Sequence, residues 1–425
     1  MKSLTLPLMI CLSALFAACN ATPGDLTPTP TLIVENPPTT QTATASAGDP
    51  TSTSTVAPLP IPTETFTPPA PPSGAPQFIA YERGGQLLVT DVTGGVQGGT
   101  TQYTVAGVND QVINITWSPS GEYVAFVSAA QGDPHVYYIY ALGQSSPTDL
   151  GPGSAPAWSP DSQSLAYVRG IYPDDNIWTM AIDPTDNPGP RQLSFESNYT
   201  WGKPAFTPDG QSLIVAGTDR NNLGASGNTS FSLEYLSLDG SGTRTPLPGA
   251  AALEGVRLPF DMQFSRDGSH LAFSTSYHLS ACAAPGAYYV SNPDGSNRQE
   301  LLSPSLKPAI DAAQEHYHTG LSYGWSPFSD ALVIIGNVLD CNFNSPTSGQ
   351  SIAGPQMSIL GLDGSERLII PGMFYGMSMD RSGVWVAASH YQSIQDSDPL
   401  LEIYSTQTGQ RILTVGPGRG AQLQP

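Results

Sequence analysis

The stretch APAWSPDSQSLAYV, residues 155–168, decides the fold, because close variants of it recur along the chain. They are NITWSPSGEYVAFV (114–127), PAFTPDGQSLIVAG (204–217), MQFSRDGSHLAFST (262–275), YGWSPFSDALVIIG (323–336) and the weaker MSMDRSGVWVAAS (377–389). Proline suits the second position of a tight turn, aspartate bonds back onto the turn backbone, and glycine adopts positive φ. An alternating apolar run follows each turn, so each copy predicts a β-hairpin.

Two further strand-like segments follow each hairpin, for example NIWTMAID (176–183) and RQLS (191–194). Four antiparallel strands repeated every 40 to 60 residues, roughly, are typical of β-propeller blades. Each hairpin has an aromatic residue, or its equivalent, just before the tight turn, and we call this place the hairpin position. It is occupied in turn by Trp117, Trp158, Phe206, Phe264, Trp325 and Met379. The fold class is therefore all-β, with one blade starting at each of these residues.

The number of blades depends on the two ends of the repeat region. QFIAYERGGQLLVTDVTGG (77–95) and TTQYTVAG (100–107) supply three strands that lack an innermost partner. The segment GAQLQP (420–425) resembles APAWSP (155–160) and provides that partner. We expect seven blades, the last closed by N- and C-terminal strands, which leaves no open sheet edge on the ring. The alternative is six blades with residues 78–105 as an appendage.

These hairpins resemble the WD-type repeats of the TolB β-propeller family over essentially all of residues 78–425. The resemblance implies a TolB-like propeller domain spanning residues 77–425. Nothing in the sequence matches the separate N-terminal domain of TolB, which weakens any expectation of a TolB-type envelope role. The hairpins also resemble the propellers attached to prolyl-type peptidases, but no catalytic α/β domain with a Gly-x-Ser-x-Gly motif follows.

The N-terminus predicts export. Lys2 precedes an apolar stretch from Leu4 to Phe16, too short to span a bilayer, and Ala17-Ala18-Cys19 is a small-residue cleavage site. This pattern resembles the bacterial lipobox, with Phe16 at the usual leucine position. The resemblance implies a lipoprotein signal peptide (1–18) and lipidation of Cys19, hence an extracytoplasmic protein anchored to the membrane, at the cell surface or in the periplasm. The alternative is an ordinary secretory signal.

Residues 19–76 predict a disordered spacer behind the lipidated cysteine. They are rich in threonine, proline and serine and show no hydrophobic periodicity. The whole chain carries a net charge of −20 and has three lysines. This charge excludes nucleic acid as an expected partner, because no basic patch exists to displace counterions. We expect a monomer that binds a neutral or cationic protein, peptide or glycan.

The connections differ between the two faces of the predicted ring. Labelling the strands of a blade A to D from the centre outward, the A–B turns are uniformly short, whereas several B–C and D–A connections are long. They include residues 219–230, 276–286, 303–321 and 337–355. The B–C and D–A connections open onto one face, here called the loop-rich face, where propellers usually bind ligands. Cys282 and Cys341 lie in neighbouring B–C loops, so we expect a disulfide between them.

Two sets of candidate site residues fall on the loop-rich face. Aromatic and acidic side chains that can stack on sugars or anchor a peptide form the first set: Tyr172, Asp174, Asp175, Trp201, Phe260, Tyr277, Tyr317, Tyr323, Phe343, Tyr375 and Tyr391. Histidines that can hold a divalent metal form the second: His278, His316, His318 and His390.

The sequence favours a non-catalytic binding or scaffolding module that needs no cofactor. The alternative is a metal-dependent polysaccharide lyase or hydrolase on the same face, similar to the pectin-fragment lyases that use a seven-bladed propeller. The alternative is weakened by the scarcity of arginine and lysine, which a lyase needs to neutralise a uronate carboxylate. No phosphate-binding or dinucleotide motif is present.

Overall fold

The computed structural model describes the repeat region with short gaps: residues 77–103, 112–128, 134–141, 143, 146–170, 175–182, 189–197, 199–223, 229–249, 259–275, 287–312, 317–318, 323–340, 345–347, 350–393 and 396–425. The predicted signal peptide (1–18), Cys19 and the spacer (19–76) lie outside these residues, so they stay predictions. Among the described helices, none has the length and apolar character needed to cross a bilayer.

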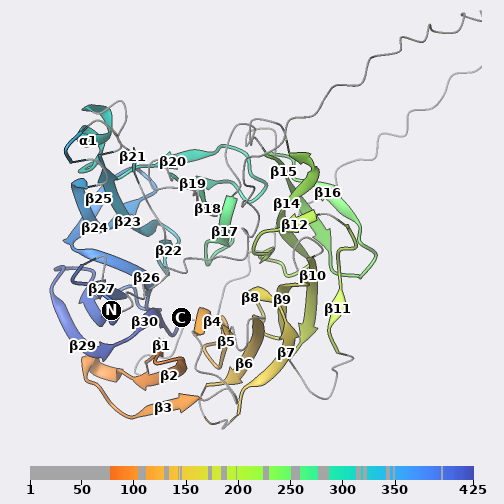
Figure 1. Cartoon of the computed structure of the whole chain (residues 1–425), viewed down its shortest axis with the longest axis horizontal. Coiled ribbons are helices and arrows are strands. Elements are labelled where there is room, and N and C mark those ends of the chain that lie inside the picture. Colours follow the sequence, from red (N-terminus) through yellow and green to blue (C-terminus); the bar gives the residue numbers. More distant parts are fainter. Residues whose placement is uncertain are drawn as a thin grey trace, which may run out of the picture. The chain divides into compact units, whose positions relative to one another are not determined.

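Seven antiparallel sheets follow one another round a common axis, with the first strand of each sheet near the centre and the last at the rim (Figure 1). The first three are β4 (Val112–Trp117), β5 (Tyr123–Ser128), β6 (His135–Tyr140) and β7 (Thr148–Pro152); β8 (Ser154–Trp158), β9 (Ser164–Arg169), β10 (Asn176–Ala181) and β11 (Arg191–Gln192); and β12 (Tyr199–Trp201), β13 (Ala205–Phe206), β14 (Ser212–Leu223), β15 (Thr229–Ser237) and β16 (Arg244–Pro246).

The next three sheets continue the same order. They are β17 (Pro259–Phe264), β18 (Leu271–Thr275), β19 (Ala287–Ser291) and β20 (Gln299–Leu301); β21 (Tyr317–His318), β22 (Tyr323–Trp325), β23 (Ala331–Leu339), β24 (Ser351–Gly361) and β25 (Glu366–Pro371); and β26 (Met373–Met379), β27 (Trp385–Tyr391), β28 (Leu400–Ser405) and β29 (Arg411–Pro417). A short helix, α1 (Lys307–Ala312), lies at the periphery of the ring.

The seventh sheet joins the two ends of the repeat region, as predicted. It contains β30 (Arg419–Leu423), β1 (Phe78–Arg83), β2 (Gln86–Asp91) and β3 (Thr100–Tyr103), in that order from the centre, with a short 3₁₀ turn η1 (Thr93–Gly95) after β2. Strand β30 pairs antiparallel with β1, Ile79 opposite Leu423. The six-blade alternative is therefore wrong, and the seven-bladed β-propeller is confirmed.

The core lies between neighbouring sheets. One apolar cluster joins Tyr103 and Val89 of the seventh sheet to Phe126 and Ile139 of the first, and similar clusters fill the other spaces between blades. Each second strand, such as β5 or β9, is buried on both faces because a sheet packs on either side of it. Every blade thus needs both neighbours to bury its faces, which is why the hairpin recurs.

Three tryptophans at the hairpin position connect neighbouring blades. The indole Nε1 of Trp158 donates to Thr116 O of the preceding blade, that of Trp325 to Gln263 O, and that of Trp117 to Gln422 O. In each case the acceptor comes one residue before the equivalent hairpin position of the preceding blade. The aromatic residue that was predicted to mark each blade therefore also fixes the blade's register on its neighbour.

Two A–B turns have serine where the others have glycine. Ser162 (φ 64°) and Ser329 (φ 60°) adopt the left-handed conformation that glycine tolerates best. Each serine compensates by accepting a hydrogen bond from the turn of the preceding blade: Ser120 N donates to Ser162 Oγ at 2.9 Å, and Asp267 N donates to Ser329 Oγ at 3.1 Å. These hydroxyls link neighbouring turns round the ring.

The buried Ser162 hydroxyl allows a stability prediction. Ser162→Ala removes the acceptor and keeps the strained backbone, so the free energy of unfolding should fall by about 1–2 kcal/mol. Ser162→Gly also removes the acceptor but relieves the strain, so its loss should be smaller, about 1 kcal/mol or less. Urea unfolding of the two variants measures the difference; a glycine variant less stable than the alanine variant would contradict the prediction.

The innermost strands share an irregularity three residues before the hairpin position. Asn114, Ala155, Asp261, Gly376 and Gly420 all have φ between 48° and 65°, and a β-bulge interrupts the ladder at each. In the third blade the break falls between β12 and β13, at Gly202 to Pro204. A bulge bends an edge strand and re-aims its side chains, so these residues form a ring of equivalent positions round the axis.

Candidate functional site

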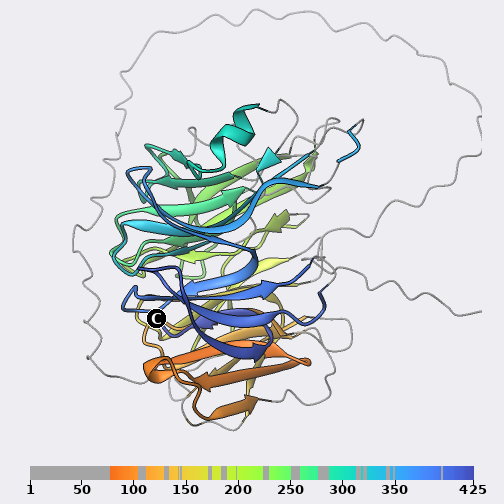
Figure 2. The ribbon, with the colours of Figure 1, turned by 90° about the vertical axis from the view of Figure 1, so that its left-hand side faces the viewer.

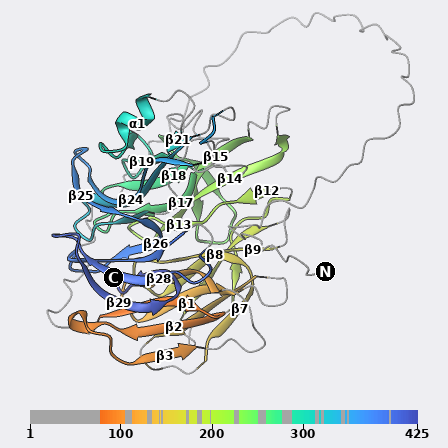
Figure 3. The ribbon, with the colours of Figure 1, turned by 60° about the vertical axis from the view of Figure 1, so that its left-hand side comes forward.

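The loop-rich face is extended by two hairpins. The ladder of β14 and β15 continues to the pair Leu223–Thr229, and that of β23 and β24 to Leu339–Ser351. Parts of the two longest expected B–C loops are therefore strand. The pairing of the second and third strands of these blades continues beyond the ends of the other strands. Figures 2 and 3 show the sheets from the side and obliquely, with these long strands reaching beyond their neighbours.

An ion pair joins two of the equivalent axial positions. Lys203 Nζ lies 2.7 Å from Asp261 Oδ1 of the next blade, and both side chains are about one-third exposed. Gln263 Nε2 donates to the other carboxylate oxygen of Asp261 at 2.8 Å. On the other side of the ring the same positions are Gly376 and Gly420, where a Cβ on Gly376 would lie 2.9 Å from Gly420 Cα. Among the described residues, the axial positions thus hold one ion pair together with Asn114, Ala155 and two glycines.

Two predicted tyrosines meet on the loop-rich face. Tyr391 ends β27, beside the B–C connection, and its ring packs edge-to-face on Tyr375 of β26 with centroids 5.0 Å apart. Both side chains are half-buried, which is the usual state of rings that keep an apolar body packed and one edge accessible. The structure therefore brings these two candidate face residues together.

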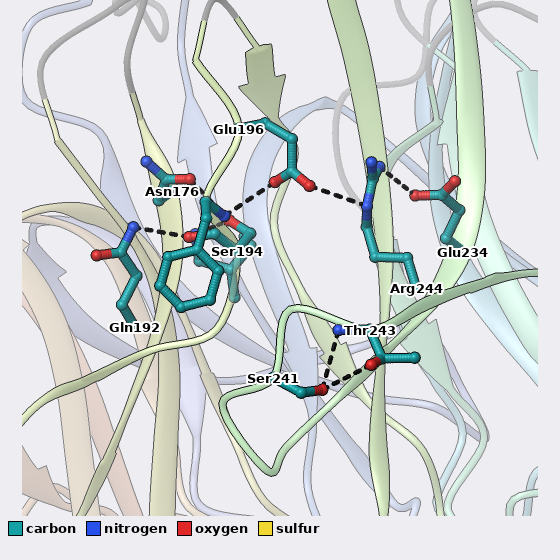
Figure 4. A network of polar contacts seen from close by, with 10 residues as sticks. Asn176, Gln192, Ser194, Glu196, Glu234, Ser241, Thr243 and Arg244 are labelled. Atoms are coloured by element: carbon teal, nitrogen blue, oxygen red, sulfur yellow. Dashed lines mark hydrogen bonds and ion pairs between the residues drawn. The ribbon is translucent and has the colours of Figure 1, made fainter.

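A polar network lies between the second and third blades (Figure 4). Arg244 Nε is 3.1 Å from Glu196 Oε1 and Arg244 Nη1 is 2.6 Å from Glu234 Oε2, while the guanidinium stacks on the rings of Tyr199 and Trp201. Burial lowers the pKa of Arg244, but the two glutamates outweigh it and raise the pKa above its ordinary value. This arginine anchors the D–A connection that carries Glu196.

Flanking hydrogen bonds hold both sides of that network, as the same view shows. Ser194 Oγ donates to Asn176 Oδ1 at 3.0 Å, and Gln192 Nε2 donates to Ser194 O at 2.7 Å. In the C–D turn of the third blade Ser241 Oγ donates to Thr243 Oγ1 at 2.7 Å. The Arg244 guanidinium and the carboxylates of Glu196 and Glu234 are paired with one another, so we assign this network a structural role.

The one predicted metal ligand whose side chain is described, His390, belongs to a buried carboxylate cluster. Its Nδ1 lies 2.8 Å from Oε2 of Glu402, which is 1% exposed. Arg411 Nη1 reaches Glu402 Oε1 at 2.6 Å, and the Tyr404 hydroxyl donates to Oε2. Burial raises the pKa of Glu402, but the hydrogen bonds from Tyr404, Arg411 and His390 outweigh burial and hold its pKa below the ordinary value.

Two predicted face residues are buried, which corrects their assignment. Trp201 is 5% exposed and packs with Phe206 and Val215, and Tyr323 is 4% exposed. The Tyr323 hydroxyl donates to Ala272 O at 3.0 Å and contacts Asp261 O. Both rings lie in innermost strands and pack against the preceding blade, so they wedge between blades instead of presenting a surface.

The other predicted site residues are described in part or not at all. Asp175 is half-buried just before β10. Phe260, Tyr317 and His318 lie in β17 and β21, but their side chains are outside the described part of the structure. Also outside it are Tyr172, Asp174, Tyr277, Phe343, His278, His316 and the cysteines Cys282 and Cys341. The disulfide and the metal site therefore stay predictions; no group of three or more potential metal ligands occurs among the described residues.

Sequence reasoning missed Lys203, Asp261, Arg244 and Glu402. Lys203 and Asp261 each stand three residues before a hairpin aromatic, so alignment of the repeats could have identified them as equivalent positions in adjacent blades. No such signal marks Glu402, whose partners come from β27, β28 and β29. The burial of Glu402 can be recognised only in the folded blade, where three strands surround the carboxylate.

Comparison with solved structures supports the fold. An oligogalacturonate lyase in complex with manganese matches with a TM-score of 0.50 at 15% identity, covering 79% of this chain and 84% of that one. TolB from Acinetobacter baumannii matches with a TM-score of 0.43 at 16% identity, covering 84% of this chain and 68% of that one. No family model matches the sequence. The chain has a TolB-like β-propeller fold, and at these identities the likeness is one of fold alone.

Proposed function

We propose that the propeller is a non-catalytic binding module, which binds a protein, peptide or glycan through its loop-rich face. In this proposal the lipid on Cys19 anchors the protein outside the cytoplasm and the spacer to residue 76 holds the propeller away from the membrane. The Tyr375–Tyr391 ring pair carries the proposal, because it is a half-buried aromatic pair at the mouth of a B–C connection. Tyrosine rings in this setting recognise sugars and peptides at small entropic cost.

The polar groups at the axial positions fit recognition better than reaction. The Lys203–Asp261 pair neutralises itself at 2.7 Å, and Asn114, at the equivalent axial position of the first blade, is exposed. An amide and a closed ion pair offer hydrogen bonds without a strong acid or base. The net charge of −20 favours a neutral or cationic ligand over nucleic acid.

A glycan and peptide array probed with the full-length chain tests the proposal. We expect the wild type to bind at least one ligand class, and Tyr391→Ala to weaken that binding at least tenfold, since loss of a central interface tyrosine typically costs more than 1 kcal/mol. Tyr140→Ala is a matched control, because Tyr140 also packs edge-to-face on a tyrosine, Tyr123, but ends β6 on the opposite face. Binding that Tyr140→Ala abolishes and Tyr391→Ala leaves intact would contradict the proposal.

The alternative is a metal-dependent polysaccharide lyase or hydrolase. It is favoured by the fold shared with the manganese-bound oligogalacturonate lyase. In this chain it requires His278, His316 and His318 to converge. His390 contacts Glu402 through Nδ1, so it could bind a metal only through Nε2.

A further inference from the structure

The A–B turns lie on the face opposite the loop-rich one, and they are alike in backbone. In each of six turns the fourth residue donates to the carbonyl of the first, at 2.8 to 3.0 Å, as in Gly121 N to Ser118 O and Gly268 N to Ser265 O. The second residue is proline in four of them: Pro119, Pro160, Pro208 and Pro327. In the other two it is Arg266 and Arg381. Because the turn geometry is the same, it does not require arginine there.

Contacts between turns place the two arginines near each other. A Cβ on Gly268 would come within 2.5 Å of Pro208, and one on Gly383 within 2.7 Å of Phe328, so each turn lies against the next round the ring. The turn of Arg266 is linked to the turn 326–329 by the bond from Asp267 N to Ser329 Oγ. The turn of Arg381 contacts the same turn from the other side. Only the turn 326–329 therefore separates the two arginines.

Arg266 has no hydrogen-bond or ion-pair partner among the described residues, although it is half-buried. The adjacent carboxylate of Asp267 accepts bonds from Ser265 Oγ, Ser269 N and Ser269 Oγ. By contrast, Arg244 and Arg367 are paired with carboxylates. Arg169 and Arg298 are also half-buried without a carboxylate, but each guanidinium lies over an aromatic ring, and Arg266 has no such contact among the described residues.

The electrostatics of the two guanidinium groups agree with this geometry. Burial lowers the pKa of Arg266, and the positive charge of Arg381 lowers it further. Two cations held near each other in a partly desolvated place repel, and an anion bound between them would remove that repulsion. Phe328, 69% exposed on the turn between them, adds an apolar surface beside the charges.

We propose that Arg266 and Arg381 form a binding site for an oxyanion, a phosphate or carboxylate group, on the turn face of the propeller. The planar guanidinium groups offer paired N–H donors, which match the oxygens of either group. This site is separate from the proposed ligand surface, because it lies at the other end of the strands. It would let the protein bind two ligands, one on each face.

Isothermal titration calorimetry of the full-length chain tests the site, with inorganic phosphate and with succinate as separate probes at constant ionic strength. We expect saturable binding of at least one probe, and the probe that binds identifies the anionic group. Arg266→Pro and Arg381→Pro should each weaken binding about tenfold or more, the loss expected for a charge-assisted hydrogen-bond pair. Arg367→Gln, which removes an arginine already paired with Asp330, is the control.

The proline variants restore the residue that four sister turns carry, so they should fold. Their unfolding midpoints without anion should equal or exceed that of the wild type, because the like-charge contact is gone. If a proline variant does not fold, Arg266→Gln provides the same comparison. The site is disproved if neither probe binds saturably, or if Arg266→Pro and Arg266→Gln bind as tightly as the wild type.

Discussion

Deleting residues 419–425 should abolish cooperative unfolding of the propeller. These residues form β30, the innermost strand of the seventh blade, with Ala421 and Leu423 fully buried. The deletion removes the acceptor for Trp117 Nε1 and the bonds that join Gln77, Phe78 and Gly121 to Gln424. It also exposes the edge of β1. These losses together are comparable with the roughly 5–15 kcal/mol of net stability typical of a domain.

Near-UV circular dichroism and urea unfolding measure this effect. A milder variant, Leu423→Ala, should lower the free energy of unfolding by about 2–5 kcal/mol, because the leucine is 2% exposed. Ile369→Ala is the control, since this half-exposed residue of β25 should cost less than about 1 kcal/mol. A deletion variant with a native spectrum and an unchanged urea midpoint would show that the ring does not depend on β30.

Glu402→Gln should lower the free energy of unfolding by about 2–3 kcal/mol at pH 7. The substitution keeps the shape but removes the charge that holds Arg411, His390 and the Tyr404 hydroxyl. Breaking a buried charged network leaves its partners desolvated and unsatisfied, and hydrogen bonds to charged groups carry the larger share of such losses. Because the Arg411 side chain is exposed to solvent, its ion pair with Glu402 is screened. The expected loss of unfolding free energy is therefore smaller than for a fully buried pair.

The pH dependence of this loss follows from the lowered pKa of Glu402. Because the pKa is lower in the folded protein, the carboxylate contributes its full stabilisation above the unfolded value of about 4.3, and that stabilisation is lost as the pH falls through the folded pKa. The gap between wild type and Glu402→Gln should therefore be full at pH 7 and shrink below about pH 4. Urea unfolding of both proteins at pH 7 and at a pH below about 4 measures this gap.

Glu122→Gln is the matched control for this prediction, because Glu122 is exposed and its carboxylate makes none of the hydrogen bonds described. Its free energy of unfolding should stay within about 0.5 kcal/mol of the wild type at both pH values. A Glu402→Gln variant whose deficit grows as the pH falls would mean that the folded protein prefers the protonated acid, contrary to the network described.

The repeat pattern predicted the blades because turn chemistry and strand alternation are local. Trp117, Trp158 and Trp325 stand where each blade begins, and the likeness of GAQLQP to APAWSP located the closing strand. Contacts between blades were harder to predict from the sequence. The Lys203–Asp261 pair joins residues 58 positions apart, and the axial bulges bring them together.

Burial of individual rings could not be predicted from chain position alone. Trp201 and Tyr323 flank D–A connections, as Tyr375 does, yet they pack inside while Tyr375 stays half-buried. The difference depends on which side of an innermost strand faces the preceding blade, and the breaks in β12–β13 and β21–β22 shift that alternation. The longest loops were likewise overestimated, because β14 and β24 extend into them.

Elemental metal analysis of the full-length chain, purified without chelator, tests most directly the central claim that the loop-rich face binds without metal-dependent chemistry. The matched variant is the double substitution His316→Ala/His318→Ala. We expect less than about one-tenth of an equivalent of divalent metal in either protein, against one equivalent for a filled catalytic site. Near-stoichiometric metal in the wild type that is lost in the double variant would contradict a non-catalytic binding role and favour the lyase or hydrolase.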